Sequence, residues 1–453
     1  MNLIAAPLRF GLNLFLASCL LPVDFGQMVI PAAIVSLSAV LVDSGFKASL
    51  IQKSTLKNNH CSTVFFVNLG VSCILFLLFT LLALPIELFF NIENLSVLII
   101  VTSFSLVLRS LSMVHEARMQ IRGRYGLLIF IEMLSYIIGY GIAIIMAKKG
   151  YGALSIAVMS ITTAIGYTGG LWMSERFLPQ YDLISRRLFW MHWRMGRSLL
   201  GQGVLEVFSE KIDEILLGKF IGISKLGIYS KGREYTNTLG VIGSKFFARP
   251  WFSVMSKYSG NKIFFFERYK LAFAGLSGAG ILLIAFNFYL GSTFINLVLG
   301  AQWSAMAGLF TYFVASIATY YLVVFNKYSI LALGKPAINL KIELYYNFLK
   351  LSLLTMIFIF LVKNPDLIIF LILLDIGAKL IMLFFQGLSL NKFLHKQSAF
   401  IIYLCTLLLL FPFIVSLVVT SPLIFGIATL FSLVMVLVVI FTVFQKKIYL
   451  PSE

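Results

Sequence analysis

Long apolar stretches recur along the whole chain, and they restrict the fold more than any other feature of the sequence. A helix that crosses the hydrocarbon of a bilayer needs roughly 20 apolar residues at a rise of about 1.5 Å each. Fourteen such stretches occur, bounded by charges, Pro, Gly or Asn. They cover approximately residues 4–21, 28–46, 62–88, 95–114, 127–147, 152–174, 198–220, 226–247, 269–290, 304–326, 338–361, 367–388, 398–420 and 422–444.

The composition excludes a water-soluble protein. Hydrophobic residues make up 60% of the 453 residues, charged residues make up 12%, and the mean hydropathy is +0.96. A soluble domain with these values would expose a very large apolar surface. A membrane β-barrel would show short alternating segments instead of long apolar runs. The sequence therefore predicts an all-α polytopic membrane protein with about 14 transmembrane helices.

Basic residues are distributed unequally between the two sets of loops. The formal net charge is +18, from 36 Lys and Arg against 18 Asp and Glu, and in a soluble protein this excess would favour nucleic-acid binding. Here 26 cations fall in one alternate set of connections and span ends, five fall in the other, and five lie within spans. By the positive-inside rule, both termini are predicted to be cytoplasmic, with the chain in the inner (cytoplasmic) membrane and no nucleic-acid partner.

The first apolar stretch begins close to Met1 and contains Arg9 as its single charge. It lacks a convincing small-residue cleavage site before Pro22, so we expect a span rather than a signal peptide.

The longest connection, approximately residues 175–197, lies between the sixth and seventh spans. From Arg186 to Arg194 it interleaves cations with aromatic side chains. Two interpretations fit this pattern: an interfacial helix lying on an anionic leaflet, or an aromatic belt combined with a positive-inside anchor. Either way the connection divides the chain into two six-helix lobes. The expected boundaries are 1–178 for the N-terminal lobe, 179–197 for the linker, 198–390 for the C-terminal lobe, and 391–453 for two extra helices and a tail.

The sequence contains no motif for ATP hydrolysis, metal binding or nucleophilic catalysis. It has no G-x-x-x-x-G-K-[ST] or G-x-S-x-G segment, and its four His are dispersed without paired-ligand spacing. The four Cys lie in or beside apolar stretches and form no CxxC or disulfide framework. The expected external loops do not exceed about fifteen residues, which argues against a catalytic loop. We expect a chain that is not an enzyme and has no metal or cofactor.

Ionisable side chains inside spans are costly, so each is expected to be functional or paired. On the seventh span, Glu206, Glu210 and Asp213 share one helical face. This polar stripe continues on the eighth span. It fits either a water-filled cavity between the lobes or interhelical salt bridges that close the bundle. The stripe consists of Glu206, Glu210, Lys211, Asp213 and Glu214 on the seventh span, and Tyr229, Lys231, Arg233, Glu234, Tyr235 and Asn237 on the eighth.

Other spans carry further ionisable residues. Glu132 on the fifth span has no local partner and is either a proton or cation carrier or a buried protonated acid. Asp375 and Lys379, at i and i+4 on the twelfth span, are predicted to form a self-contained structural pair. Glu343 and Lys350 on the eleventh, two turns apart, are open to either interpretation.

Three blocks of the sequence resemble one known family. They are Leu20-Leu21-Pro22-Val23-Asp24-Phe25-Gly26 with Asp43-Ser44-Gly45-Phe46 and Leu50-Ile51-Gln52-Lys53; Lys211 to Gly222 with Leu226-Gly227-Ile228-Tyr229-Ser230; and Leu297 to Trp303. In this order they are similar to the oligosaccharide flippases of polysaccharide biosynthesis, the Wzx-type members of the multidrug/oligosaccharidyl-lipid/polysaccharide exporter superfamily.

The resemblance implies two pseudo-symmetric six-helix lobes around a central cavity, with two extra C-terminal helices and alternating access. The implied cargo is a polyprenyl-pyrophosphate-linked oligosaccharide, an O-antigen, capsule or exopolysaccharide repeat unit, moved from the cytoplasmic to the outer leaflet. Expected partners are this lipid-linked oligosaccharide, membrane lipids, and a polysaccharide polymerase and glycosyltransferases. Members usually have a longer segment before the first helix, so that helix is expected to be shortened or the chain to start further upstream.

A pyrophosphate needs cations, and Arg offers bidentate contacts where Lys offers a point charge. We expect cationic head-group ligands, sugar-facing aromatic and amide side chains, and carboxylates that hold the cations or bind a driving ion. Arg233 has no counterpart in the family pattern, so its role rests on its place in the span. The head-group ligands are Arg9, Lys211, Lys231 and Arg233; the sugar-facing residues are Tyr229, Tyr235 and Asn237; the carboxylates are Glu206, Glu210, Asp213 and Glu132.

Two other classes of protein remain as alternatives. A cation-coupled multidrug antiporter of the same superfamily would have the same lobes, but usually twelve spans and an apolar, acidic cavity. The cations of the seventh and eighth spans favour an anionic cargo instead. A membrane polysaccharide polymerase or ligase is disfavoured by the short external loops. Asp24 and Gly26 are expected in a tight external turn, and Gly218 with Gly222 at the end of the seventh helix, all chiefly for backbone geometry and close packing.

Overall fold

The computed structural model describes residues 2–43, 45–52, 57–361, 366–394, 398–418 and 422–448. Within these ranges the chain is helical apart from short connections and contains no β-strand. Fourteen helices of 18 residues or more match the fourteen predicted spans one for one, which confirms the all-α fold. Three residues named above, Met1, Ser44 and Lys53, lie outside the described ranges.

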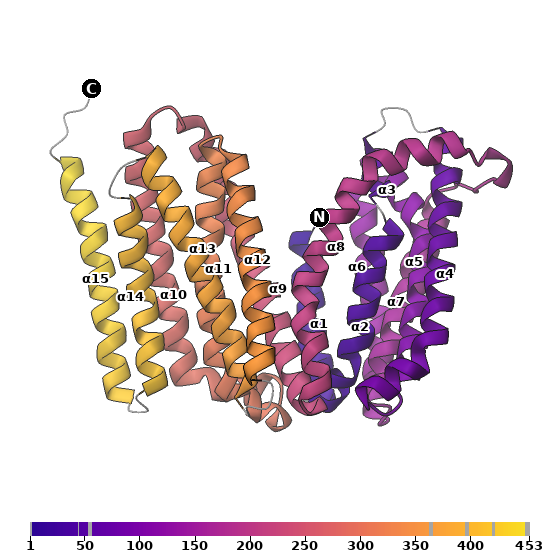
Figure 1. Ribbon diagram of the computed structural model, residues 1–453, viewed down its shortest axis with the longest axis horizontal. Helices are drawn as coiled ribbons and strands as arrows, with labels where there is room; N and C mark the ends of the chain where they lie inside the picture. Colours follow the sequence, from indigo (N-terminus) through magenta and orange to yellow (C-terminus); the bar gives the residue numbers. More distant parts are fainter. Residues whose placement is uncertain are drawn as a thin grey trace. The chain divides into compact units, whose positions relative to one another are not determined.

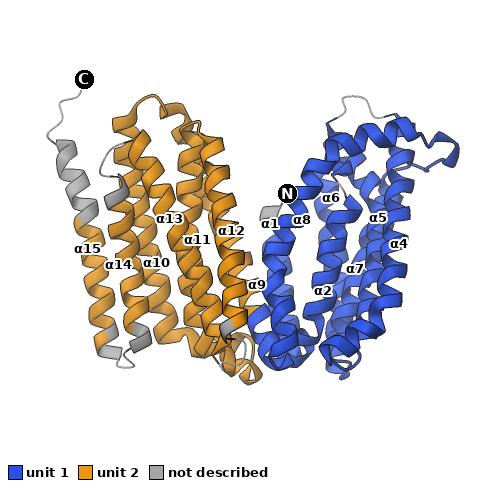
Figure 2. Ribbon diagram, viewed as in Figure 1, with its two compact units in different colours: residues 1–230 blue, residues 231–453 orange. Residues whose placement is uncertain are grey.

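The chain forms two compact units, residues 1–230 and 231–453 (Figures 1 and 2). Unit 1 contains the first seven long helices, one short helix and the first turns of an eighth long helix. Their bounds are α1 (Asn2–Cys19), α2 (Pro22–Asp43), α3 (Phe46–Ile51), α4 (Asn58–Phe90), α5 (Leu95–Ile121), α6 (Tyr125–Lys148), α7 (Ala153–Ser174), α8 (Arg186–Phe220) and α9 (Ile223–Met255).

Unit 2 continues α9 and adds six long helices. They are α10 (Lys262–Val298), α11 (Ser304–Ala332), α12 (Pro336–Leu361), α13 (Leu367–Phe393), α14 (Ser398–Val418) and α15 (Pro422–Ile448). Helix α10 is the centre of this unit and packs against α11, α14 and α15. Its core is aromatic, since Tyr269 stacks on Phe325 of α11 and the Phe273 ring packs against Phe325 at a tilt. The Tyr269 hydroxyl donates to Asn326 Oδ1 at 2.7 Å, which satisfies a buried polar group.

Nine helices among the described residues are long and apolar enough to cross a membrane by composition alone, namely α2 with α3, α4 to α7, and α10 to α13. In the described parts of α14 and α15 the apolar stretches are shorter, at Ile401–Val415 and Gly426–Val438. The chain is therefore a multi-pass membrane protein.

The predicted lobes and the contact units differ in where the seventh span belongs. Helix α8 packs on α2, α3 and α4 and so lies within unit 1, whereas the sequence-based boundary placed it in the C-terminal lobe. The predicted linker is also not a separate element, because residues 186–197 are the first turns of the same 35-residue helix. The division into six-helix lobes stays a prediction.

The first turns of α8 attach the predicted amphipathic segment to unit 1. Phe189 and Trp193 pack against Phe46 of α3, while the Arg side chains and Trp190 are exposed. His192 is fully buried. One face of this segment is therefore held by protein and the other carries cations, an arrangement compatible with both interpretations of the sequence.

Glycines bring the N-terminal ends of α2 and α9 into backbone contact within unit 1. A Cβ added at Gly26 would lie 2.0 Å from the Ile223 carbonyl oxygen, and one at Gly227 would lie 1.9 Å from the Pro22 oxygen. Neither space admits a side chain. Two of the blocks that carry the family resemblance therefore meet here. The expected packing role of Gly26 is confirmed, but its expected place in a turn is wrong, because Gly26 lies within helix α2.

Asp24 lies in the first turn of α2 and acts as a cap. Its Oδ2 accepts from the backbone N–H of Leu21 at 2.8 Å, and its carboxylate also bonds the backbone of Ala153 at the start of α7. Gly218, near the end of α8, packs closely on Ile30, whereas Gly222 has open space. The packing interpretation is thus correct for Gly218 and wrong for Gly222.

Candidate functional site

The residues predicted to bind the head group and sugar are divided between the two units. Unit 1 holds Arg9, Lys211 and Tyr229; unit 2 holds Lys231, Arg233, Tyr235 and Asn237.

In unit 1, polar residues near the ends of α8 and α9 pair locally. Lys211 Nζ lies 2.9 Å from Glu214 Oε2, and the Glu214 side chain is only 3% exposed. The Tyr229 hydroxyl donates to Asp213 Oδ2 at 2.5 Å, and both residues are buried. This hydrogen bond ties the last turns of α8 to the first turns of α9.

The three carboxylates predicted to share one face of α8 have different surroundings. Glu206 and Glu210 are exposed, and only Asp213 is buried. The expected pairing of these acids with the span cations is therefore wrong for Lys211, whose described ion pair uses Glu214. The reason is local: Glu214 lies three residues from Lys211 and shares its helix face, whereas Glu210 and Asp213 are one and two residues away and point in other directions.

Lys231, at the start of unit 2, also has a partner on its own helix. Its Nζ lies 2.7 Å from Glu234 Oε2 and 5.7 Å from the centroid of the Tyr235 ring. Lys231 and Tyr235 are buried, Arg233 is half-buried and Asn237 is exposed. The first turns of unit 2 thus present an Arg beside a buried Lys and Tyr.

A charged cavity of about 310 Å³ lies inside unit 1. Five helices line it. They contribute Ala39, Val42, Asp43 and Lys47 from α2 and α3; Leu106, Arg109, Ser112, Met113 and Glu116 from α5; Glu132, Ser135 and Tyr136 from α6; and Thr163, Ala164 and Tyr167 from α7.

Helical periodicity explains why these polar side chains converge. Arg109, Ser112 and Glu116 are three and four residues apart on α5, and therefore share a face. Glu132 and Tyr136 are four apart on α6 and do the same. Charged side chains therefore reach the cavity both from the apolar middle of the spans and from one of their ends.

An ion pair crosses one side of the cavity. Lys47 Nζ lies 2.5 Å from Glu116 Oε1, with side-chain exposures of 25% and 19%. Gln120 Nε2 donates to the same oxygen at 2.9 Å. Asp43 accepts a weaker bond, 3.3 Å, from the backbone N–H of Lys47. These contacts fix the α2–α3 turn against α5.

Arg9 and Glu132, two of the predicted site residues, meet at the cavity through a tyrosine. The Tyr136 hydroxyl is 3.5 Å from Glu132 Oε1, and the Arg9 guanidinium lies over the Tyr136 ring at 5.6 Å from its centroid. A cation near a ring face is attracted by the ring quadrupole. The structure therefore brings α1 and α6 together around these three side chains.

The cavity offers both signs of charge, with Lys47 and Arg109 as cations and Asp43, Glu116 and Glu132 as acids. Cations in a low-dielectric cavity can bind a phosphate, and carboxylates there can exchange a proton or a metal cation. Sequence reasoning missed Lys47, Arg109 and Glu116 because they stand near span ends. The seven-residue spacing of Arg109 and Glu116, which puts both side chains on one face of a helix, could have indicated these two residues.

In unit 2, the predicted Asp375–Lys379 pair has a third member. Lys379 Nζ lies 2.6 Å from Asp375 Oδ2 and donates to Ser316 Oγ at 2.6 Å, while that hydroxyl donates to Asp375 Oδ2 at 2.7 Å. The pair is therefore not self-contained, because it bridges α13 and α11. Glu343 pairs with Lys327 of α11 at 2.5 Å instead of with Lys350.

Two histidines that are far apart in the sequence come together in unit 1. His192 Nε2 lies 3.0 Å from His60 Nδ1, and His192 Nδ1 lies 2.6 Å from Ser49 Oγ. The expectation that the histidines are dispersed is therefore wrong for this pair, which joins α8 to α4 and α3. Among the residues the structure describes, no three His, Cys, Asp or Glu side chains gather as metal ligands.

Comparison with known sequence families identifies the family of this chain. A sequence model of the family described as "Polysaccharide biosynthesis protein" matches residues 15–308, well over half of the chain. The chain belongs to this family. The matched range includes the cavity of unit 1 and the first turns of unit 2.

Several curated proteins are similar to this family member over part of their length. Identity is 21% over 239 residues to the succinoglycan biosynthesis transport protein ExoT of Rhizobium meliloti (strain 1021), and 25% over 189 residues to the amylovoran biosynthesis protein AmsL of Erwinia amylovora. The teichuronic acid biosynthesis protein TuaB of Bacillus subtilis (strain 168) is 24% identical over 196 residues. These matches cover 51%, 41% and 42% of this chain and 46%, 48% and 40% of those proteins, so the chain spans about half or less of each relative.

Solved structures show the same fold over most of the chain. The lipid II flippase MurJ, in an inward closed conformation, aligns with a TM-score of 0.66 and 14% identity over 97% of each chain. An inward-facing multidrug resistance MATE family transporter of the MOP superfamily aligns with a TM-score of 0.61 and 15% identity, over 87% of this chain and 96% of that one. At these identities the likeness concerns the fold.

Proposed function

We propose that this chain is a flippase, and therefore not an enzyme, that moves a polyprenyl-pyrophosphate-linked oligosaccharide from the cytoplasmic to the outer leaflet by alternating access. The observation that carries the proposal is the charged cavity of unit 1, inside a multi-pass member of the polysaccharide biosynthesis family. A sugar and a pyrophosphate are costly to move through hydrocarbon, so their carrier needs polar groups at membrane depth. The name of one relative, the succinoglycan biosynthesis transport protein ExoT, supports a step in polysaccharide transport.

Within unit 1, we expect Arg109, Lys47 and Arg9 to attract the pyrophosphate. Arg109 is favoured because its guanidinium offers a bidentate contact and Lys47 is already paired with Glu116. Of the residues predicted from sequence, Lys211 and Lys231 have carboxylate partners, which weakens them as phosphate ligands. Arg233 and the sugar-facing Tyr229, Tyr235 and Asn237 stay predictions, as does ion coupling at Glu206, Glu210 and Asp213.

Glu132 is our proposed coupling residue. This acid of the cavity lies near the Tyr136 hydroxyl, and the Arg9 guanidinium lies over the ring of the same tyrosine. Proton or cation binding there would change the charge that faces the head group. We further propose that both termini are cytoplasmic, that the membrane is the inner (cytoplasmic) one, and that glycosyltransferases and a polymerase act before and after this step.

A surface-polysaccharide assay tests the head-group residue. In a strain that lacks its own copy, Arg109→Gln should lower surface polysaccharide at least tenfold at unchanged protein level, and lipid-linked repeat units should accumulate on the cytoplasmic side. Arg124→Gln is the matched control, because Arg124 is exposed between α5 and α6 and does not line the cavity. Normal surface polysaccharide in Arg109→Gln would contradict the assignment.

A cation-coupled multidrug antiporter is the second candidate function. It is favoured by one observation: the cavity has three carboxylates, Asp43, Glu116 and Glu132, against two cations. The same strain distinguishes the two functions. An antiporter would protect cells from cationic drugs in a Glu132-dependent manner without restoring surface polysaccharide.

A further inference from the structure

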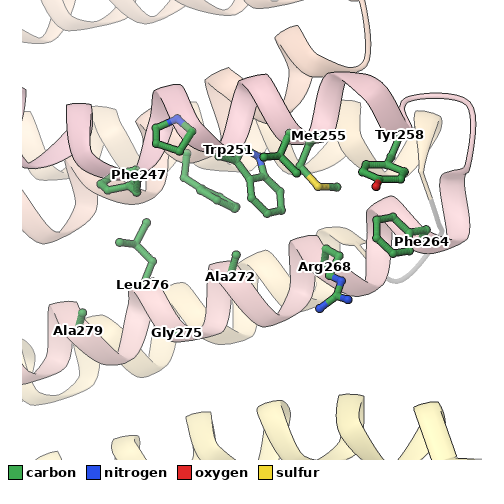
Figure 3. Close-up of a pocket in the computed structure, with 13 residues that line it drawn as sticks. Phe247, Trp251, Met255, Tyr258, Phe264, Arg268, Ala272, Gly275, Leu276 and Ala279 are labelled. Carbon is green, nitrogen blue, oxygen red and sulfur yellow. The ribbon is translucent and has the colours of Figure 1, made fainter.

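A second cavity lies in unit 2, and its lining is mostly apolar. It is a groove of about 660 Å³ between α9 and α10 (Figure 3). The residues that line it are Phe247, Pro250, Trp251, Val254, Met255, Tyr258, Phe264, Arg268, Ala272, Gly275, Leu276, Ala279 and Phe325.

The groove exists because one helix supplies large side chains and the other supplies small ones. Ala272, Gly275 and Ala279 lie on one face of α10, and a Cβ added at Gly275 would meet nothing within 4 Å. On α9, Phe247 and Trp251 form the opposite wall (Figure 3). The groove is therefore open space left by missing side chains.

The wall on α9 is held in place, so the groove is preformed. The Trp251 indole N–H donates to Ser329 Oγ at 2.9 Å, and the Trp251 ring lies 4.6 Å from the Phe325 ring. At one end the rings of Tyr258 and Phe264 lie 4.5 Å apart and close the groove. A preformed apolar groove loses little free energy to ordering when a chain enters it.

A single charge, Arg268, stands at this closed end. Its guanidinium lies over the Phe264 ring, 5.3 Å from the centroid. The adjacent Glu267 is bound to Lys270 at 2.6 Å, and no ion pair to Arg268 occurs among the described residues. Lys257, exposed in the α9–α10 connection, adds positive charge nearby. This end therefore attracts an anion.

The length of the groove identifies the kind of chain that fits. From Arg268 to Ala279 the α10 wall rises about 16 Å, at about 1.5 Å per residue. Half of a hydrocarbon core of about 30 Å is about 15 Å, the depth of one leaflet. An acyl chain of a phospholipid in the leaflet beside Arg268 would fill the groove, whereas a much longer prenyl chain would overrun it.

We propose that this groove binds one acyl chain of an anionic phospholipid, whose phosphate contacts Arg268. Arg forms paired hydrogen bonds with phosphate, and a zwitterionic lipid would bring its own cation to the same place. The site is independent of the transported substrate. It gives unit 2 a lipid-specific contact in the leaflet that the charge pattern predicts to be cytoplasmic.

Native mass spectrometry of the full chain tests this site. The protein is purified in detergent and incubated with equimolar phosphatidylglycerol and phosphatidylcholine. We expect at least a fivefold preference for phosphatidylglycerol in the wild type and in Lys262→Gln, a control at the same end but outside the groove lining. Arg268→Gln should reduce the preference to less than twofold, and Arg268→Lys should restore part of it.

A variant that fills the groove tests the contribution of the acyl chain separately from that of the charge. Gly275→Leu places a side chain in the open space and should remove tight binding of both lipids, with Gly260→Leu, in the exposed connection, as its control. If Gly275→Leu does not fold, the Arg268 series still decides the proposal. An unchanged preference in Arg268→Gln would overturn it, as would a prenyl phosphate that competes better than phosphatidylglycerol.

Discussion

At the scale of single residues, many cations that the loop count treats as orientation signals also hold the helices together. Glu175, at the end of α7, accepts from Arg118 at 2.9 Å and from Arg122 at 2.8 Å, and its side chain is fully buried. Removing a buried acid leaves its partners without a counter-charge. Glu175→Ala should therefore lower the free energy of unfolding by about 3 kcal/mol, measured by denaturant titration in detergent.

The half-exposed partner provides the control for that measurement. Arg122 is 48% exposed and its ion pair is screened by solvent, so Arg122→Gln should cost much less than Glu175→Ala. Equal losses for the two variants would show that burial does not set the strength of this cluster.

The ion pair at the charged cavity can be measured in the same way. Lys47 and Glu116 lie 2.5 Å apart and are partly buried, so we expect Lys47→Met and Glu116→Gln to be non-additive by about 1 kcal/mol in a double-mutant cycle. Strictly additive losses would mean that the pair does not fix the α2–α3 turn against α5.

The residues of the site could be predicted only in part from the sequence. Arg9 and Glu132 stand out because each is a lone charge in an apolar stretch, and the structure places Arg9 over the Tyr136 ring and Glu132 near its hydroxyl. Lys47 and Arg109 do not stand out, because a cation near a span end fits the positive-inside rule equally well. Which connection folds back onto a cavity depends on tertiary packing, which a single sequence does not encode locally.

At the scale of elements, close backbone contacts between helices help to fix the arrangement of unit 1. Between α2 and α9 the space for a Cβ at Gly227 is absent, since it would lie 1.9 Å from the Pro22 oxygen. Gly227→Ala should cost about 2 kcal/mol in the free energy of unfolding, because the backbones must separate. Gly70→Ala is the matched helical control: nothing lies within 4 Å there, and we expect no loss. A stable Gly227→Ala would disprove the contact.

The helices themselves were predictable because hydrocarbon accepts few structures. All fourteen predicted spans correspond to helices, including α8 and α9, whose charges make them poor spans by composition. What could not be predicted is that α8 continues without a break from the amphipathic segment, or that His192 on that segment bonds His60 and Ser49. Such contacts join residues more than a hundred positions apart.

At the scale of the whole molecule, the proposed function requires that each of the two units contribute differently. Unit 1 contains the charged cavity, whose cations we propose for the pyrophosphate and whose Glu132 we propose for coupling, whereas unit 2 contains the apolar groove with Arg268 at its end. Loss of the groove should therefore change lipid preference and leave cargo selectivity intact, while loss of Arg109 should do the reverse.

Transport of the cargo by the purified protein tests the central claim most directly. The full chain is reconstituted into liposomes that carry a fluorescent polyprenyl-pyrophosphate-linked oligosaccharide, and the fraction of label reached by an impermeant quencher is followed over time. We predict that the wild type moves label between leaflets, that Arg124→Gln does the same, and that Arg109→Gln slows movement at least tenfold. Wild-type vesicles that match protein-free liposomes would contradict the account.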